Sequence, residues 1–153
     1  SGKINYTTGP FGEKFETKFS KFIGNKYSVA VCNGTAALEV AIKSLNLPKN
    51  SKIIVPARSF FSSAACIVNT GHTPVFVDVD LKTQNISLKD LKNKITKNIR
   101  AIICVHLAGL PCDMHNIKKI INKYKIKIIE DCSQAHGASI KKKQVGSFGD
   151  IST

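Results

Sequence analysis

The chain has 153 residues, 42% of them hydrophobic, which suits one globular domain with a buried core. No signal peptide and no apolar run near the ~20 residues of a membrane span are present, so we expect a cytoplasmic protein without a membrane partner. The net charge of +13 comes from 21 lysines and only two arginines, without interleaved aromatics, so we expect no nucleic-acid partner either.

The first 45 residues predict a helix, a strand and a second helix. Aromatic side chains at positions 11, 15, 19 and 22 share one helical face, so the stretch from Phe11 to Phe22 is expected to pack that face into the core. The apolar run from Tyr27 to Cys32 predicts a short strand. The turn Asn33-Gly34-Thr35 then leads into a helix from Ala36 to Leu45.

Strands and helices alternate through the rest of the chain. This order predicts βαβ units and a three-layer α/β fold, with a mostly parallel sheet covered on both faces. The chain starts without Met and ends at Gly149 to Thr153, where another strand begins, so we expect a fragment of one domain. The expected strands are 52–56, 74–79, 101–106 and 126–129, and the expected helices are 61–70, 87–94 and 114–124.

The five cysteines form no Cys-x-x-Cys pair, and an odd number does not suit a disulfide framework. Buried free thiols are the expected state. Cys112, Asp113 and His115 lie close in sequence but offer too few ligands at unusual spacing for zinc, so we predict no metal.

The turn Asn33-Gly34-Thr35-Ala36 can bind a phosphate group. Gly34 can adopt a positive φ, and the following amides are unpaired donors at a helix N-terminus. An ordinary helix cap made by Asn33 or Thr35 is the alternative. No Gly-x-Gly-x-x-Gly or Walker pattern is present, which disfavours a dinucleotide or nucleoside triphosphate.

Two aromatic residues follow the strand at 52–56. At least one of the two rings, Phe60 or Phe61, must therefore lie at the carboxyl end of the strand. A flat ligand can stack on an aromatic side chain at a strand's carboxyl end. The alternative is that the aromatic pair belongs to the core.

Asp131 and Gln134 follow the apolar run from Ile126 to Ile129. The carboxyl ends of parallel strands are where ligands bind, although a solvated turn would also explain polar groups there. A carboxylate can keep a ring nitrogen protonated, and an amide can donate to an exocyclic oxygen. Phosphate turn, aromatic platform and carboxylate together match pyridoxal 5'-phosphate (PLP).

Six blocks of the sequence carry a specific family resemblance. They resemble the DegT/DnrJ/EryC1/StrS family of PLP-dependent sugar aminotransferases over essentially the whole chain, in family order. The blocks are SGKINYTTGP, CNGTAALEVAIKSL, KIIVPARSFFSSA, GHTPVFVDVD, AIICVHLAGLPCDM and IIEDCSQAHGASIKKKQVGSFGDIST.

The resemblance implies part of a fold-type-I large domain, with the C-terminal domain outside this chain, and a homodimer when full length. By position, Gly34, Thr35 and Ala36 match the phosphate turn and Phe60 the residue stacked on the pyridine ring. We therefore expect Phe60 to face a ligand and Phe61 to pack in the core. Asp131 matches the carboxylate at the ring nitrogen, and Gln134 the amide near the ring hydroxyl.

Other matches are weaker. The loop from Tyr6 to Pro10 resembles one near the family's active site. His106 and His136 match family positions, but either can equally be a structural histidine. The family's Schiff-base lysine follows beyond Thr153, and none of the 21 lysines present stands in its motif.

The implied reaction moves an amino group, expected from glutamate as donor, to a keto sugar on a nucleotide carrier. One alternative is a PLP-dependent or PMP-dependent sugar dehydratase of the same fold, in which His replaces the lysine beyond Thr153. A non-catalytic relative is another, which the presence of Asp131 and Gln134 disfavours.

Overall fold

The computed structural model describes residues 9–153, so only the last two residues of the Tyr6–Pro10 loop lie within the described part. Its centre is an all-parallel five-stranded sheet with the strand order β2-β1-β3-β4-β7. The predicted α/β class with a mostly parallel sheet is confirmed, and the strand expected after Gly149 is present as β7. The strands are β1 (Lys52–Pro56), β2 (Thr73–Val77), β3 (Ile99–Val105), β4 (Lys127–Asp131) and β7 (Ile151–Ser152).

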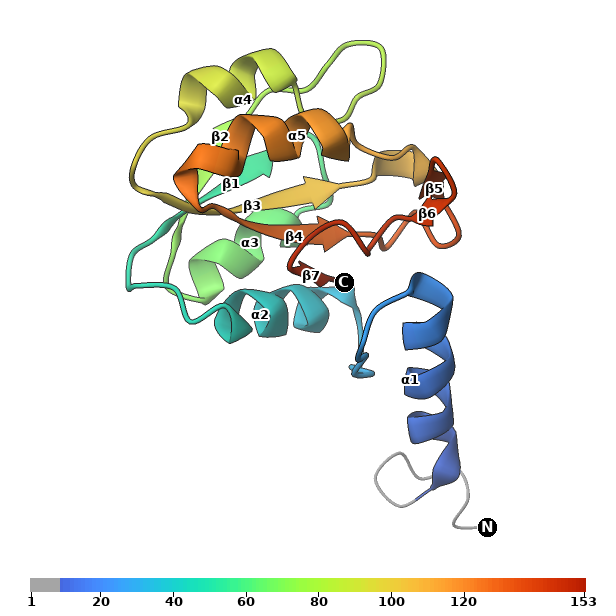
Figure 1. Cartoon of the computed structure of the whole chain (residues 1–153). Helices are drawn as coiled ribbons and strands as arrows, with labels where there is room; N and C mark the ends of the chain where they lie inside the picture. Colours follow the sequence, from blue (N-terminus) through green and yellow to red (C-terminus); the bar gives the residue numbers. More distant parts are fainter. Residues whose placement is uncertain (1–8) are drawn as a thin grey trace.

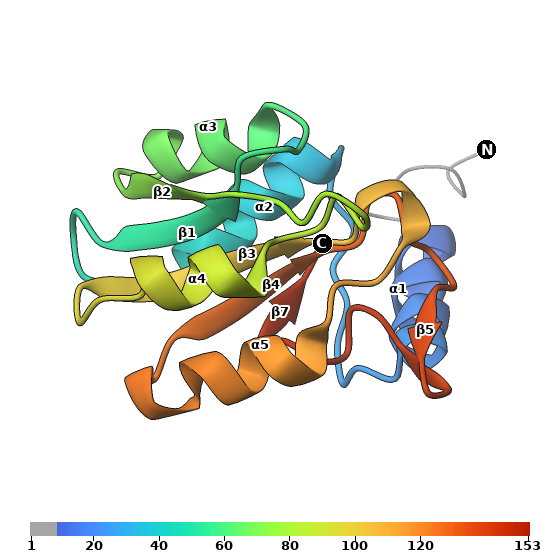
Figure 2. The same ribbon diagram turned by 90° about the horizontal axis from the view of Figure 1, so that it is seen from above.

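Helices cover both faces of this sheet (Figures 1 and 2). One face packs against α2 (Gly34–Ser44) and α3 (Ser62–Asn69), and the other against α4 (Leu88–Lys94) and α5 (Met114–Ile121). Short 3-10 turns, η1 (Leu107–Gly109) and η2 (Asn122–Tyr124), follow β3 and α5. Successive strand residues point to opposite faces, so Ile128 joins the α4/α5 core and Ile129 the α2/α3 core.

The helix α1 (Pro10–Ile23) forms as predicted, but the expected burial of its aromatic face is wrong. It projects from the body of the molecule, and Phe11, Phe15 and Phe22 are more than half exposed (Figure 1). Its C-terminal part reaches the body, where Phe19 lies edge-on to His136 and the buried Ile23 lies near Gly146. Periodicity predicts which residues share a helix face, but burial requires a second surface to cover that face.

The strand expected from Tyr27 to Cys32 is absent. Within this segment, the Ser28 hydroxyl donates to the backbone carbonyl of Glu16, and the Ala30 amide donates to the Glu16 carboxylate. The segment is therefore bonded to α1 rather than paired into the sheet, and Tyr27 and Val29 are about three-quarters exposed.

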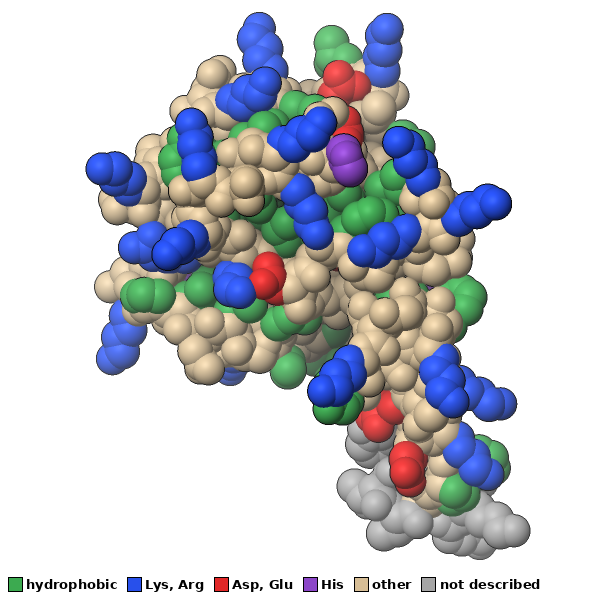
Figure 3. Space-filling model, viewed as in Figure 1, with side chains coloured by type: hydrophobic (Ala, Val, Ile, Leu, Met, Phe, Trp, Pro, Cys, Tyr) green, Lys and Arg blue, Asp and Glu red, His purple; other side chains and the backbone are tan. Residues whose placement is uncertain are grey.

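A two-stranded hairpin that the sequence did not predict stands beside the sheet, formed by β5 (Ser139–Ile140) and β6 (Lys143–Gln144). Lys141 and Lys142 form its turn with positive φ values and are exposed. Lysines are dispersed over the face seen in Figure 3. None of the helices in residues 9–153 is long and apolar enough to cross a membrane.

Four of the five cysteines are buried free thiols, as predicted, whereas Cys32 is exposed. Cys32 lies two residues before α2, where the chain has left α1 and has not yet reached the sheet.

Candidate active site

Asp131 ends β4 at the carboxyl edge of the sheet and is 7% exposed. Its Oδ1 accepts two hydrogen bonds from Ser133, one from the amide at 3.1 Å and one from the hydroxyl at 2.7 Å. Its Oδ2 has no hydrogen-bond partner among residues 9–153. One carboxylate oxygen is therefore held in place and the other is available to a ligand.

The N-terminus of α2 lies on the same face of the sheet as Asp131. Asn33 caps this helix, with Oδ1 accepting from the Ala36 amide at 2.9 Å. The Ala36 amide is thus occupied, which corrects the expectation that it is free to bind phosphate. The amides of Gly34 and Thr35 have no partner among the described residues, as expected for the first turn of a helix.

Gly34 does not adopt the positive φ expected of it, because it is already the first helical residue. Its lack of a side chain matters for space instead. A Cβ at Gly34 would lie 3.2 Å from Ser133 Oγ, the hydroxyl that donates to Asp131. The two free amides and the carboxylate therefore belong to one site. The expected helix cap is present, and two amides without a partner among the described residues lie at the same helix end.

Gln134 follows in the same loop. Its Oε1 accepts from the Ala108 amide at 2.7 Å, which fixes the side-chain amide and leaves its NH₂ group as a donor. Ala108 has a φ of 52° in η1, the turn after β3. Loops that follow two neighbouring strands thus combine to orient one amide.

Phe60 lies in the loop after β1 and is 71% exposed, so it is available to stack on a ligand. The expectation that Phe61 packs in the core is wrong, because its side chain is 80% exposed. Phe61 is the residue directly before α3, and the first helical residue, Ser62, is the one that turns inward. The Ser62 hydroxyl lies 2.7 Å from the Thr35 hydroxyl, which places the start of α3 against the start of α2.

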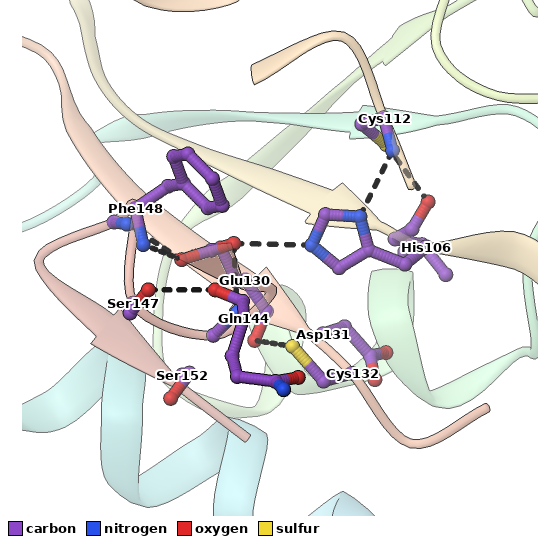
Figure 4. Close-up of polar contacts among 12 residues, drawn as sticks. His106, Cys112, Glu130, Asp131, Cys132, Gln144, Ser147, Phe148 and Ser152 are labelled. Carbon is purple, nitrogen blue, oxygen red and sulfur yellow. Dashed lines mark hydrogen bonds and ion pairs between the residues drawn. The ribbon is translucent and has the colours of Figure 1, made fainter. Parts of the chain in front are cut away.

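Glu130 precedes Asp131 in β4, and the structure differs here from the sequence prediction, which ended the strand at Ile129. Its side chain is fully buried on the opposite face. Oε1 accepts from the amides of Phe148 and Gly149, at 2.7 and 2.6 Å. Oε2 accepts from His106 Nε2 at 3.1 Å and from the Gly146 amide at 2.9 Å. Figure 4 shows the carboxylate between the His106 ring and the turn at Phe148.

Burial alone would raise the pKa of Glu130, but hydrogen bonds from His106, Gly146 and Gly149 outweigh it and hold the pKa below its usual value. Glu130 is therefore an ionised carboxylate inside the protein. Burial also raises the pKa of the nearby thiols, to about 12 for Cys112 and well above its ordinary value for Cys132. These thiols are protonated at neutral pH and unreactive.

His106 is a structural histidine with both ring nitrogens engaged. Nδ1 accepts from the Cys112 amide at 3.0 Å, so Nε2 carries the proton that is donated to Glu130. His106, Glu130 and Cys132 are close enough to suggest a metal site, but an ion would have to displace these hydrogen bonds. His136, by contrast, is exposed and lies edge-on to Phe19.

Cys112, Asp113 and His115, the metal candidate of the sequence analysis, have different structural roles. Cys112 is buried with its thiol donating to the Val105 carbonyl, while Asp113 caps α5 and His115 is exposed.

Comparison with known proteins identifies the family to which this arrangement belongs. Residues 2–153 match the model of the DegT/DnrJ/EryC1/StrS aminotransferase family. The chain belongs to this family. It is 43% identical over 145 residues to a GDP-perosamine synthase of Escherichia coli O157:H7, a match that covers 95% of the chain and 40% of that protein. It is 42% identical, with the same coverage, to a dTDP-3-amino-3,6-dideoxy-alpha-D-galactopyranose transaminase of Aneurinibacillus thermoaerophilus.

Solved structures of related proteins have the same fold. An aminotransferase from Psychrobacter cryohalolentis superimposes with a TM-score of 0.94 at 44% identity, covering 98% of this chain and 38% of that one. The GDP-4-keto-6-deoxy-D-mannose-3-dehydratase of E. coli, solved with bound hydrated PLP, gives 0.89 at 35% identity, covering 92% and 38%. The chain spans about 40% of the length of the curated relatives it matches.

Sequence reasoning missed two contributors to this aminotransferase-family site, Ser133 and Glu130. Ser133 had a recognisable signal, a hydroxyl two residues after a candidate carboxylate, which is the spacing of a local side-chain hydrogen bond. Glu130 shares the strand face of Ile128, so strand alternation alone places it inward. Gly146 and Gly149 were the complementary signal, because glycines allow backbone amides to approach a buried acceptor closely.

Proposed function

We propose that this chain is the PLP-binding part of a nucleotide-sugar aminotransferase whose C-terminal domain lies outside it. The observation that carries the proposal is the contact of Ser133 with both Asp131 and the start of α2. A carboxylate oxygen and two helix N-terminal amides, none with a partner among residues 9–153, lie side by side. That is the combination needed by a ligand with a basic ring nitrogen and a phosphate.

Each residue would hold a different part of PLP. The amides of Gly34 and Thr35 would donate to the phosphate, and the Gln134 NH₂ group to the oxygen on the ring. Phe60 would lie against the face of the ring. Asp131 would hold a proton on the ring nitrogen through its unpaired oxygen. Ala36 contributes only by donating its amide hydrogen to the Asn33 cap.

The chemistry that PLP supplies in such enzymes is the withdrawal of electrons from a carbanion into a protonated pyridine ring. In the proposed reaction an amino group moves from an amino acid, glutamate in our proposal, to a keto sugar on a nucleotide. The named activities of the E. coli and A. thermoaerophilus relatives support this substrate class. The Schiff-base lysine would come from the chain beyond Thr153.

A homodimer in the cytoplasm is part of the proposal. The exposed aromatic face of α1, made by Phe11, Phe15 and Phe22, supports association with a second copy, since such a surface is unusual on a monomer.

The similarity to the E. coli dehydratase keeps a sugar dehydratase as the second candidate. The two reactions differ in the residue at the nucleophile position beyond Thr153, Lys for the aminotransferase and His for the dehydratase. Sequencing through that position and assaying the full-length protein with glutamate and nucleotide-linked keto sugars separates them. An aminated sugar supports our proposal, and a deoxygenated keto sugar supports the alternative.

Asp131→Asn in the full-length protein tests the central assignment. The variant should still bind PLP, but its half-reaction with glutamate should fall by about 100-fold or more, because a neutral ring accepts electrons poorly. Asp113→Asn is the matched control, since asparagine caps a helix as well as aspartate does. Near-normal turnover of Asp131→Asn would remove Asp131 from its role.

A further inference from the structure

The buried pair His106–Glu130 connects three segments at the carboxyl edge of the sheet. Its carboxylate accepts four hydrogen bonds, three of them from backbone amides between residues 146 and 149. On the other side, the His106 ring accepts from Cys112 and so holds the loop after β3. Figure 4 shows the pair lying between these two loops.

The loop after β3 leads from this pair to the candidate site. The Gly109 amide donates to the His106 carbonyl and closes the turn that contains Ala108. The Ala108 amide, in turn, donates to the side-chain oxygen Oε1 of Gln134 and fixes its position. Displacement of His106 would therefore move the donor that sets the direction of the Gln134 amide.

The second segment leads from Glu130 to the chain that leaves the sheet. The turn at 146–149 runs directly into β7, which pairs with β4, and Thr153 exchanges backbone hydrogen bonds with Glu130 and Cys132. Gly146 has a φ of +87°, and a Cβ at Gly149 would lie 2.8 Å from the Ile128 carbonyl, so both glycines are needed for the turn to reach the carboxylate. The direction in which the chain continues past Thr153 depends on this turn.

Burying an ionised carboxylate is costly, and apolar residues of similar volume often fill such positions without loss of stability. The four hydrogen bonds to Glu130 offset this cost. Their donors lie on two loops, and only a group with two acceptor oxygens can accept from all four. We propose that Glu130 and His106 are positioning residues for the reaction: they set Gln134, through Ala108, and the exit of the chain past Thr153 relative to Asp131. The inference rests on the proposed function.

Two substitutions at His106 separate this role from simple packing. The side-chain amide of His106→Gln can occupy the place of Nε2 and keep the donor to Glu130, while losing the acceptor for Cys112. His106→Asn can keep the acceptor and lose the donor. Glutamine fills more of the buried ring's volume than asparagine does, so a packing role predicts that His106→Asn is the more damaging variant in every measurement.

The measurements are made on the full-length protein. For His106→Gln, which releases the Cys112 amide and with it the loop that carries Ala108, we expect a PLP dissociation constant at least about tenfold higher and a weaker visible circular dichroism of bound PLP, which reports its orientation. For His106→Asn, which keeps the Cys112 bond and loses the donor to Glu130, we expect a dissociation constant within about threefold of wild type, a dichroism signal close to that of wild type, and a fall in kcat that exceeds any change in KM. Equal effects of the two variants on PLP affinity and dichroism, or larger effects of His106→Asn on both, would overturn the proposal.

Hydrogen exchange of the wild type supplies a test that needs no variant to fold. PLP should slow amide exchange in the peptide covering residues 144–149, which the proposed PLP contacts do not include, as well as in residues 106–112. Unchanged exchange at 144–149 in protein that binds PLP would overturn the inference while leaving the proposed function intact. Absence of any PLP binding by the wild type would instead overturn the proposed function and this inference with it.

Discussion

Glu130→Gln should be among the most destabilising single-atom changes in this chain. The glutamine side chain has one acceptor oxygen and one NH₂ group, whereas both oxygens of Glu130 accept two hydrogen bonds each. In either orientation the NH₂ group faces two donors. The His106 ring cannot adapt by exchanging its proton, because Nδ1 faces the Cys112 amide.

The size of the loss follows from this count. Hydrogen bonds to a charged group are worth about 1.5–3 kcal/mol each, and two are lost while two become neutral. Two lost bonds of that worth amount to about 3–6 kcal/mol, and relaxation of the loops reduces this sum. We therefore expect the free energy of unfolding to fall by about 3–5 kcal/mol, a large part of the about 5–15 kcal/mol typical of a domain.

Urea unfolding of the apo full-length protein, followed by circular dichroism, measures this change. Glu13→Gln is the control, because Glu13 is exposed on α1 and its substitution should change stability by no more than about 0.5 kcal/mol. A loss below about 1 kcal/mol for Glu130→Gln would show that the four hydrogen bonds do not stabilise the fold as argued here.

Two further predictions concern pH and the aromatic loop. Because the pKa of Glu130 is lower in the folded protein than its ordinary value of 4.5, its contribution to stability is present above about pH 4.5 and is lost as the pH falls through the folded pKa. Acid titrations of the unfolding free energy should be less steep for Glu130→Gln than for wild type, and equal slopes would contradict this. Phe60→Ala should weaken PLP binding about tenfold or more, with little change in apo stability because the side chain is 71% exposed. Phe61→Ala should likewise change apo stability by less than about 1 kcal/mol, because this side chain is also exposed. Fluorescence titration with PLP and thermal melts measure both, and equal PLP affinities of Phe60→Ala and wild type would count against stacking.

The sheet could be predicted from the sequence because its central strands are marked by short apolar runs. The strands β1, β3 and β4 are buried on both faces, so Ile53 to Val55 and Ile102 to Cys104 appear as continuous apolar runs. The run from Tyr27 to Cys32 has the same composition but no neighbouring strand among the described residues. Composition indicates that a segment can enter a sheet, whereas pairing depends on which other segment is present.

The candidate site also contains residues that could be predicted from the sequence and residues that could not. Asp131 and Gln134 could be placed from their position after an apolar strand, because the carboxyl edge of a parallel sheet is fixed by topology. The free amides could not be assigned individually, since only the geometry of Asn33 shows that Ala36 is capped and Gly34 and Thr35 are not. The role of Glu130 depends on residues 16 to 24 positions away in the sequence, a separation that no local pattern records.

The last prediction concerns the isolated 153-residue chain. A lysine that forms a Schiff base needs activation by an apolar environment or by a neighbouring cation held against it. Every lysine among residues 9–153 is exposed to solvent, and none of the 21 in the sequence stands in the family's Schiff-base motif. Incubation with PLP, borohydride reduction and peptide mapping should therefore give only low, scattered labelling of several lysines and no transamination. The full-length protein, treated in the same way, should be labelled at one lysine beyond Thr153. Stoichiometric labelling of a single lysine within residues 1–153 would show that the nucleophile belongs to this part of the chain. The assignment of the Schiff-base lysine to the chain beyond Thr153 would then be wrong.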